Sequence, residues 1–176
     1  MAFSPVNCVK TAQIFYLGIL LIIACQFPVA NAGELSLLIN GKAIHVGADP
    51  DKHYNEKNWG AGLQYDFGVQ EDRWRSFVTM SGFLDSKENP SYYAGGGVVR
   101  HFNILPDFHQ LHFDAGLVGF FMTREDYLDG DWFPGILPFL SLGIKQVSVN
   151  ITYIPKIKPK MVELWFLQLK VPLAEF

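Results

Sequence analysis

The chain has 176 residues, of which 49% are hydrophobic, 15% aromatic and 18% charged, with a formal net charge of -3. This composition argues against disorder, which needs high charge and few aromatic residues, and the scattered basic residues argue against nucleic-acid binding. No apolar run after residue 30 approaches the roughly 20 residues of a membrane-spanning helix, so an amphipathic, β-rich domain of ordinary length remains.

Residues 1–32 have the pattern of a cleaved signal peptide. Lys10 is the only charge before residue 34, and an uncharged apolar stretch follows at 14–25. The tripeptide Ala30-Asn31-Ala32 then supplies small residues at both positions that a signal peptidase reads. We expect cleavage after this site, which leaves a single domain at 33–176.

Two other fates of this segment stay open: a retained membrane anchor, or lipidation at Cys25, because Ile22-Ile23-Ala24-Cys25 fits a loose lipoprotein signal. Both cysteines of the chain, Cys8 and Cys25, lie here. A mature chain without them has no disulfide, no thiolate nucleophile and no cysteine-bound zinc.

After residue 33 the apolar residues alternate with a period of two, which is typical of half-buried strands. The clearest example is the segment 111–121. One face of it carries Leu111, Phe113, Ala115, Leu117, Gly119 and Phe121. The pattern predicts eight strands, each near the roughly 9–11 residues that cross a bilayer when tilted. They are expected at 34–45, 59–67, 74–85, 91–102, 111–121, 135–143, 147–153 and 161–170.

Eight such strands after a signal peptide indicate an all-β protein, an eight-stranded antiparallel up-and-down transmembrane β-barrel of the outer membrane. Aromatic residues near the predicted strand ends and Phe176 at the terminus fit this class, although Pro172 interrupts the last strand pattern. The odd-numbered connections, 46–56, 86–91, 122–134 and 155–160, should face outward and be longer. A soluble periplasmic barrel or sandwich is the alternative, because the pattern does not say which face is inside.

Strand parity predicts two zones in the lumen. One end collects groups that can pair with one another, namely Gln64, Asp66, His112, Asp114, Gln168 and Lys170. The outward half instead carries Val118 and Phe120, with Val162 and Leu164 of the same parity. A barrel of eight strands is just wide enough to hold one small ligand or to be filled by side chains, so an apolar cup for a lipid chain and a filled core both stay open.

The same topology places four residues with chemical potential on the outer rim: His45, Asp85, Ser86 and Arg124. A hydroxyl beside an imidazole can attack an ester, a carboxylate can orient the imidazole, and an arginine can bind phosphate. The competing interpretation is an ordinary set of turn and loop residues, because Asp-Ser is a common turn pair. No His-x-x-x-His pair occurs on a helix, so no metal site is predicted.

Several segments resemble the lipid A palmitoyltransferase family, PagP, in the family's order. They are Tyr54-Asn55-Glu56-Lys57-Asn58-Trp59-Gly60-Ala61-Gly62, Asp85-Ser86 with Ala94-Gly95-Gly96-Gly97, Trp132-Phe133-Pro134 through Leu137-Pro138, and Thr152-Tyr153-Ile154-Pro155. The resemblance implies an outer-membrane barrel that moves a palmitoyl chain from a phospholipid to lipid A without a cofactor. The family's amphipathic N-terminal helix has no counterpart after the expected cleavage site.

The resemblance also implies residue roles. Asp85 and Ser86 match the family's catalytic pair, and His45 is the best match for its histidine. Arg124 matches an arginine of the third outer loop, and Gly97 keeps the spacing of the glycine at the floor of the acyl pocket. Inward parity, independently of the resemblance, makes Val118 and Phe120 the expected substrate-binding residues of the apolar cup.

We therefore expect an acyltransferase in which Ser86 and His45 act on a phospholipid ester, with lipid A as acceptor and no cofactor, metal or nucleic acid. The barrel is expected to act as a monomer in the bacterial outer membrane. Because Pro134, Pro138 and Pro155 donate no ladder bond, they are expected to leave a lateral gap for lipid between strands six and seven. A lipid A deacylase or phospholipase, and a non-catalytic lipid-binding or structural barrel, are the alternatives.

Overall fold

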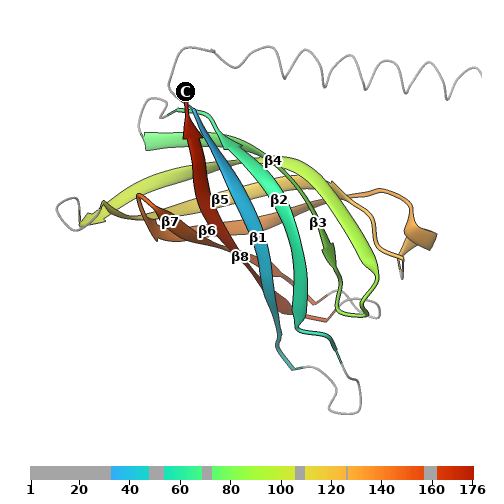
Figure 1. Ribbon diagram of the computed structural model, residues 1–176. Helices are drawn as coiled ribbons and strands as arrows, with labels where there is room; N and C mark the ends of the chain where they lie inside the picture. Colours follow the sequence, from blue (N-terminus) through green and yellow to red (C-terminus); the bar gives the residue numbers. More distant parts are fainter. Residues whose placement is uncertain (1–32, 48–53, 69–72, 106–109, 126, 157–161) are drawn as a thin grey trace, which may run out of the picture. The chain divides into compact units, whose positions relative to one another are not determined.

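The computed structural model describes residues 33–47, 54–68, 73–105, 110–125, 127–156 and 162–176. They form a closed barrel in which each strand pairs with its sequence neighbours and β8 closes antiparallel on β1 (Figure 1). The strands are β1 (Glu34–His45), β2 (Lys57–Asp66), β3 (Trp74–Leu84), β4 (Pro90–Leu105), β5 (Leu111–Met122), β6 (Phe133–Ile144), β7 (Val147–Ile154) and β8 (Leu164–Glu175). A short 3-10 turn, η2 (Leu128–Gly130), lies between β5 and β6.

The predicted all-β barrel with eight strands is confirmed, and β1 has the predicted bounds. The last strand was placed wrongly at 161–170, because it runs from Leu164 to Glu175 and includes Pro172. Pro172 lies opposite Ser36, next to a register shift in the β1–β8 ladder. An irregular ladder position tolerates the missing N–H, which explains why the proline does not end the strand. The expected signal peptide at 1–32 lies outside the described residues.

The two ends of the barrel differ. At the terminal end, Gly33 and Phe176 exchange backbone hydrogen bonds of 3.0 and 2.8 Å, and the connections run over 67–73, 106–110 and 145–146. At the other end, here called the rim end, the connections run over 46–56, 85–89, 123–132 and 155–163. Three of these four are longer than any connection at the terminal end, as the alternation of outward and inward loops predicts.

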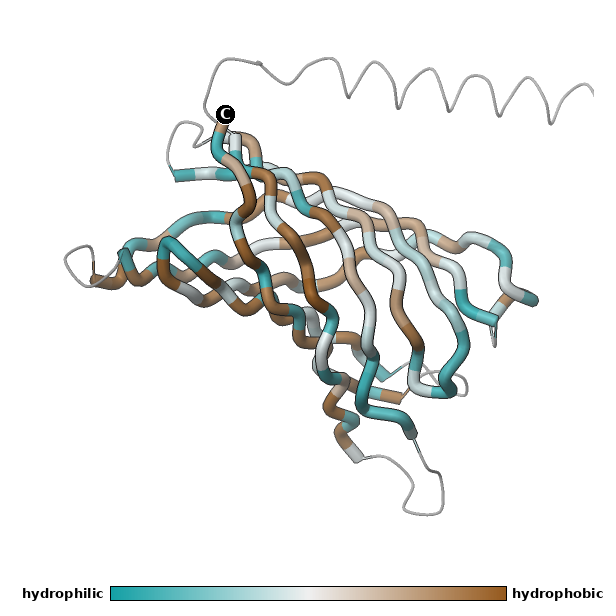
Figure 2. Tube along the Cα trace, in the orientation of Figure 1, coloured by the Kyte–Doolittle hydropathy of each residue, from teal (hydrophilic) through white to brown (hydrophobic). Residues whose placement is uncertain are grey.

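The outward face of the barrel is apolar. Ile136 is 74% exposed, Trp59 61% and Leu117 57%, whereas Ser36, Asn40 and Gln168 are buried in the lumen. Figure 2 shows apolar and polar residues alternating along the strands. This distribution is the reverse of that in a water-soluble barrel, so it excludes the soluble alternative and is the one that a hydrocarbon environment favours. Among the described residues no helix is long and apolar enough to span a membrane.

The lumen toward the terminal end carries paired polar groups, as predicted, and a polar cavity lies among them, with Glu34, Asp114 and Lys170 in its lining. Gln168 Nε2 donates to Asn40 Oδ1 at 2.6 Å and to the Tyr93 hydroxyl at 2.8 Å. Lys170 Nζ lies 2.6 Å from Asp66 and 3.1 Å from Glu34. Buried polar groups are stable only when paired, and the hydrogen bonds of Gln168 cross the lumen between the rim cavity and the polar cavity at the terminal end.

A small apolar cluster lies beside this network. Phe77, Val99, Val118 and Phe139 are all buried, and Phe120 and Leu137 pack against them. The rings of Phe77 and Phe139 lie with their centroids 4.9 Å apart. The cluster joins β3, β4, β5 and β6 across the lumen, and it bounds the open space nearer the rim.

Candidate active site

The structure brings the predicted base and nucleophile together at the rim end. His45 is the last residue of β1, and Ser86 lies in the turn that follows β3. The two side chains meet with His45 Nε2 and Ser86 Oγ 3.0 Å apart. That separation falls in the range of about 2.6–3.2 Å required of an activated serine, so in the Nδ1-protonated tautomer the hydroxyl donates to the imidazole.

His45 packs against an aromatic ring. Its imidazole stacks on Tyr54 with centroids 4.7 Å apart and planes inclined by 21°. The charged side chains around it are Glu56 and Arg124, which have opposite signs. A neutral imidazole can accept the serine proton, which is the state that a general base needs.

Asp85 does not contact His45. Its Oδ1 accepts the backbone N–H groups of Lys87 at 2.8 Å and Asn89 at 3.0 Å, the geometry of an aspartate-stabilised turn. Its Oδ2 lies 3.9 Å from Arg124 Nη2. The buried carboxylate therefore stabilises the turn that carries Ser86 and balances the charge of Arg124. It makes no hydrogen bond that would orient His45.

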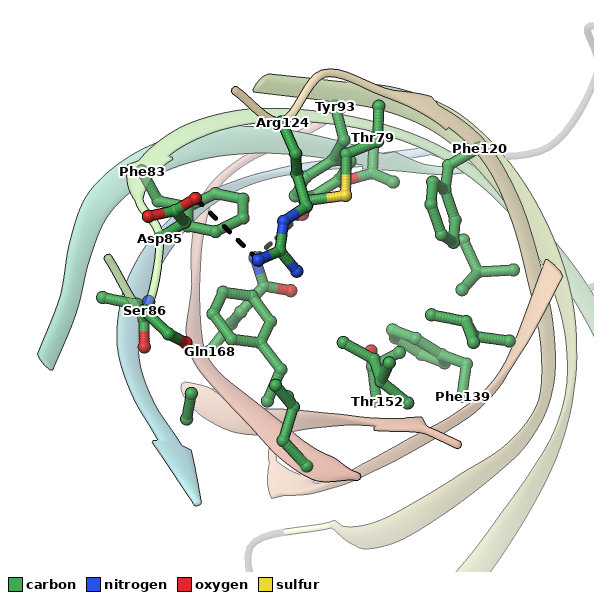
Figure 3. Close-up of a pocket in the computed structure, with 18 of the residues that line it drawn as sticks. Thr79, Phe83, Asp85, Ser86, Tyr93, Phe120, Arg124, Phe139, Thr152 and Gln168 are labelled. Atoms are coloured by element: carbon green, nitrogen blue, oxygen red, sulfur yellow. Dashed lines mark hydrogen bonds and ion pairs between the residues drawn. The ribbon is translucent and has the colours of Figure 1, made fainter. Parts of the chain in front are cut away.

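A cavity opens from the rim end into the lumen beside Ser86. Figure 3 shows Arg124 projecting into it toward Asp85, with Phe120 and Phe139 on the opposite side. Val118 and Phe120 line the cavity, as inward parity predicts, so the rim half of the lumen holds an apolar cup rather than a completely filled core. Its other apolar walls come from Phe83, Leu137, Phe139, Ile154, Leu164 and Phe166, and its inner polar residues are Gln64, Thr79, Tyr93 and Gln168.

Gly97 lies deeper than the cavity and does not line it. It faces into the lumen opposite Phe77 on β3 and Val118 on β5. A Cβ built on Gly97 would collide with the Phe77 ring and lie 2.6 Å from the Leu117 carbonyl oxygen. The Phe77 ring therefore occupies the space above the glycine, and the described cavity ends nearer the rim than the glycine itself.

The three prolines lie where β6 and β7 separate. The two strands pair only from Ile144 opposite Val147 to Phe139 opposite Thr152. Residues 133–138 of β6, which include Pro134 and Pro138, have no β7 partner in this register, and Pro155 follows the end of β7. Within the described residues, the barrel wall is thus unpaired on this side of the cavity, where the sequence predicted a gap.

Sequence reasoning missed two residues of the site. Tyr54 precedes β2 and contacts His45, and Asn58 is an inward-facing residue of β2 that lines the cavity. Neither contact is visible in the sequence, although the alternation that places Trp59 outward assigns Asn58 to the inner face. Among the described residues, no group of three or more His, Cys, Asp or Glu side chains gathers that could hold a metal ion.

Comparison with known proteins gives one consistent result. Residues 29–170 match the family described as "Antimicrobial peptide resistance and lipid A acylation protein PagP". The chain is 30% identical over 138 residues to the lipid A acyltransferase PagP of Bordetella pertussis, covering 75% of this chain and 74% of that protein. It is 35% identical over 132 residues to that of Legionella longbeachae, covering 70% and 54%.

Among solved structures, the outer membrane protein Ail of Yersinia pestis is similar at a TM-score of 0.44 and 12% identity, over 80% of this chain and 99% of that one. The closed barrel of this chain is established by the pairing of its own eight strands.

Proposed function

The chain belongs to the PagP family of lipid A acylation proteins, and from this premise we propose its acyl donor, its catalytic residues and its route of lipid entry. It is a lipid A acyltransferase of the bacterial outer membrane, with lipid A as the acceptor. The proposed donor is a phospholipid, because a membrane barrel with an apolar internal cup meets acyl chains attached to phospholipids from the surrounding bilayer.

Ser86 and His45 are the proposed catalytic pair. As the Ser86 oxygen forms a bond to the ester carbonyl carbon of the donor, its proton passes to His45 Nε2, and the lysophospholipid oxygen leaves with that proton. A hydroxyl of lipid A then attacks the same carbonyl and gives its proton to His45, which returns a proton to the Ser86 oxygen as the bond between the acyl group and Ser86 breaks. The observation that carries this proposal is the 3.0 Å contact between Nε2 and Oγ at the mouth of an apolar cavity.

Arg124 is the proposed phosphate-binding residue. Its guanidinium lies beside the buried Asp85 carboxylate and projects into the mouth of the cavity (Figure 3). A guanidinium there can bind the phosphate of the donor while the acyl chain extends between Val118 and Phe120. Asp85 is proposed to hold this cation in place rather than to orient His45.

The proposed route of entry is lateral, through the unpaired wall between β6 and β7. Pro134 and Pro138 supply no N–H to that wall, so an acyl chain passing there breaks no backbone hydrogen bond from them. Because the apolar outer surface faces lipid, the barrel is proposed to work as a monomer.

The test is an assay of the purified barrel in detergent micelles with a labelled phospholipid and lipid A. Ser86→Ala and His45→Ala are each expected to lower acyl transfer by roughly 10³-fold or more, whereas Ser148→Ala, a buried lumen serine at the terminal end, is the matched control. Transfer that survives both rim substitutions in folded protein would refute the catalytic pair. Free fatty acid released in place of acylated lipid A would indicate a hydrolase.

A further inference from the structure

The segment Tyr54–Asn58, which leads into β2, contacts His45, Ser86 and the nearby Leu84. The Tyr54 ring stacks on His45, the Asn55 N–H donates to the Ser86 carbonyl at 2.8 Å, and Asn58 Nδ2 donates to the Leu84 carbonyl at 2.7 Å. These contacts link residues that are far apart in the sequence. None of them belongs to the strand ladder, so the fold does not require them for barrel closure.

The orientation of the His45 ring depends on Tyr54. Within the described residues, His45 Nδ1 is buried and has no hydrogen-bond partner. No carboxylate therefore holds the ring, since Asp85 is engaged with its own turn and with Arg124. The nearly parallel Tyr54 ring restricts rotation of the imidazole about its side-chain bond, and this keeps Nε2 directed at the serine oxygen.

The position of Ser86 depends in turn on Asn58. Leu84 is the last residue of β3, and the Asp85-Ser86 dipeptide follows it at once. Asn58 is 2% exposed, and its amide holds the Leu84 carbonyl on one side of the dipeptide while the Asn55 N–H holds the Ser86 carbonyl on the other. Burying an amide costs desolvation energy, and the hydrogen bond to Leu84 offsets it for Nδ2 only, because Asn58 Oδ1 is buried without a partner among the described residues.

We propose that Tyr54 and Asn58 are positioning residues of acyl transfer: Tyr54 sets the plane of the His45 imidazole, and Asn58 sets the turn that presents Ser86. The proposal rests on the proposed function of His45 and Ser86. Neither Tyr54 nor Asn58 takes a proton or bonds to the acyl group in this proposal. Both act through His45 and Ser86, which do. The segment Tyr54–Asn58 thereby couples the start of β2 to the catalytic geometry.

The Tyr54 test compares Tyr54→Phe and Tyr54→Leu in the micelle assay. The leucine variant is expected to lose about 10- to 100-fold in kcat with less than about threefold change in KM, because a misplaced base affects the transition state more than lipid binding. The phenylalanine variant keeps the ring and is expected to retain most of the turnover. Tyr92→Leu, which alters an exposed tyrosine of β4, is the matched control.

The Asn58 test compares Asn58→Ala with Asn150→Ala, which removes a buried amide of β7 that does not line the cavity. Asn58→Ala is expected to lower kcat about tenfold or more, and Asn150→Ala to leave it within about twofold, although both lose one buried hydrogen bond. Folding of each variant is checked by circular dichroism and by the heat-dependent mobility of the barrel on gels.

A measurement without substrate completes the test. The stacked Tyr54 ring is expected to shift the His45 imidazole proton resonances upfield in the wild type and Tyr54→Phe, and this shift should vanish in Tyr54→Leu. If the wild type is active while Tyr54→Leu and Asn58→Ala match it in kcat, the positioning proposal fails and the function stands. If the folded wild type transfers no acyl chain, the proposed function itself fails.

Discussion

Phe77→Ala is expected to lengthen the acyl chain that the enzyme prefers. Phe77 is 2% exposed, its ring lies against Gly97, and its centroid is 4.9 Å from that of Phe139, which lines the cavity. Removing its ring opens the lumen by one further layer of inward-facing residues. Two residues along a strand tilted by about 40° correspond to about 5 Å along the barrel axis, room for roughly four more methylene groups.

The assay offers the enzyme an equimolar mixture of phospholipids with saturated chains of different length and measures acylated lipid A by mass spectrometry. Product ratios are compared rather than total activity, because losing a buried phenylalanine costs about 3–5 kcal/mol of stability and lowers the folded fraction. Val99→Ala, in the same cluster but farther from the cavity, is the control for stability loss. An unchanged ratio in folded Phe77→Ala would refute the assignment of this ring as the inner end of the acyl site.

Two further predictions concern the same site. Gly97→Met is expected to push the Phe77 ring toward the rim and shorten the preferred chain in the same competition assay, and an unchanged profile would place the acyl site elsewhere. The second prediction concerns pH: only the neutral His45 imidazole can accept the proton of Ser86, whose Oγ lies 3.0 Å from Nε2. The wild-type kcat/KM should therefore fall as the pH is lowered and His45 becomes protonated, and a kcat/KM that does not fall at low pH would contradict a neutral His45 base.

The barrel was predictable from the sequence because strand alternation is a local signal. Gln64 and Val118 were assigned to the lumen by parity alone, and both are buried there. The end of β8 was missed, since Pro172 is acceptable only at a register shift whose position depends on the partner strand. Local propensity contains no information about such a shift.

The site was only partly predictable. Topology placed His45 and Ser86 on one rim, but their 3.0 Å contact depends on how the first and second rim connections meet. The role of Asp85 in its own turn follows from the preference of aspartate for such turns, and a local interpretation would have found it. The stacking of Tyr54 and the filling of space above Gly97 by Phe77 join separate segments, so only the folded structure reveals them.

The most direct test of the account is the mass of lipid A from cells that express the wild type, cells that express Ser86→Ala, and cells without the protein. The account predicts a gain equal to one fatty acyl chain in the wild-type cells alone, with folded barrel present in the outer membrane of both expressing strains. An equal gain with Ser86→Ala, or a loss of an acyl chain with the wild type, would contradict it.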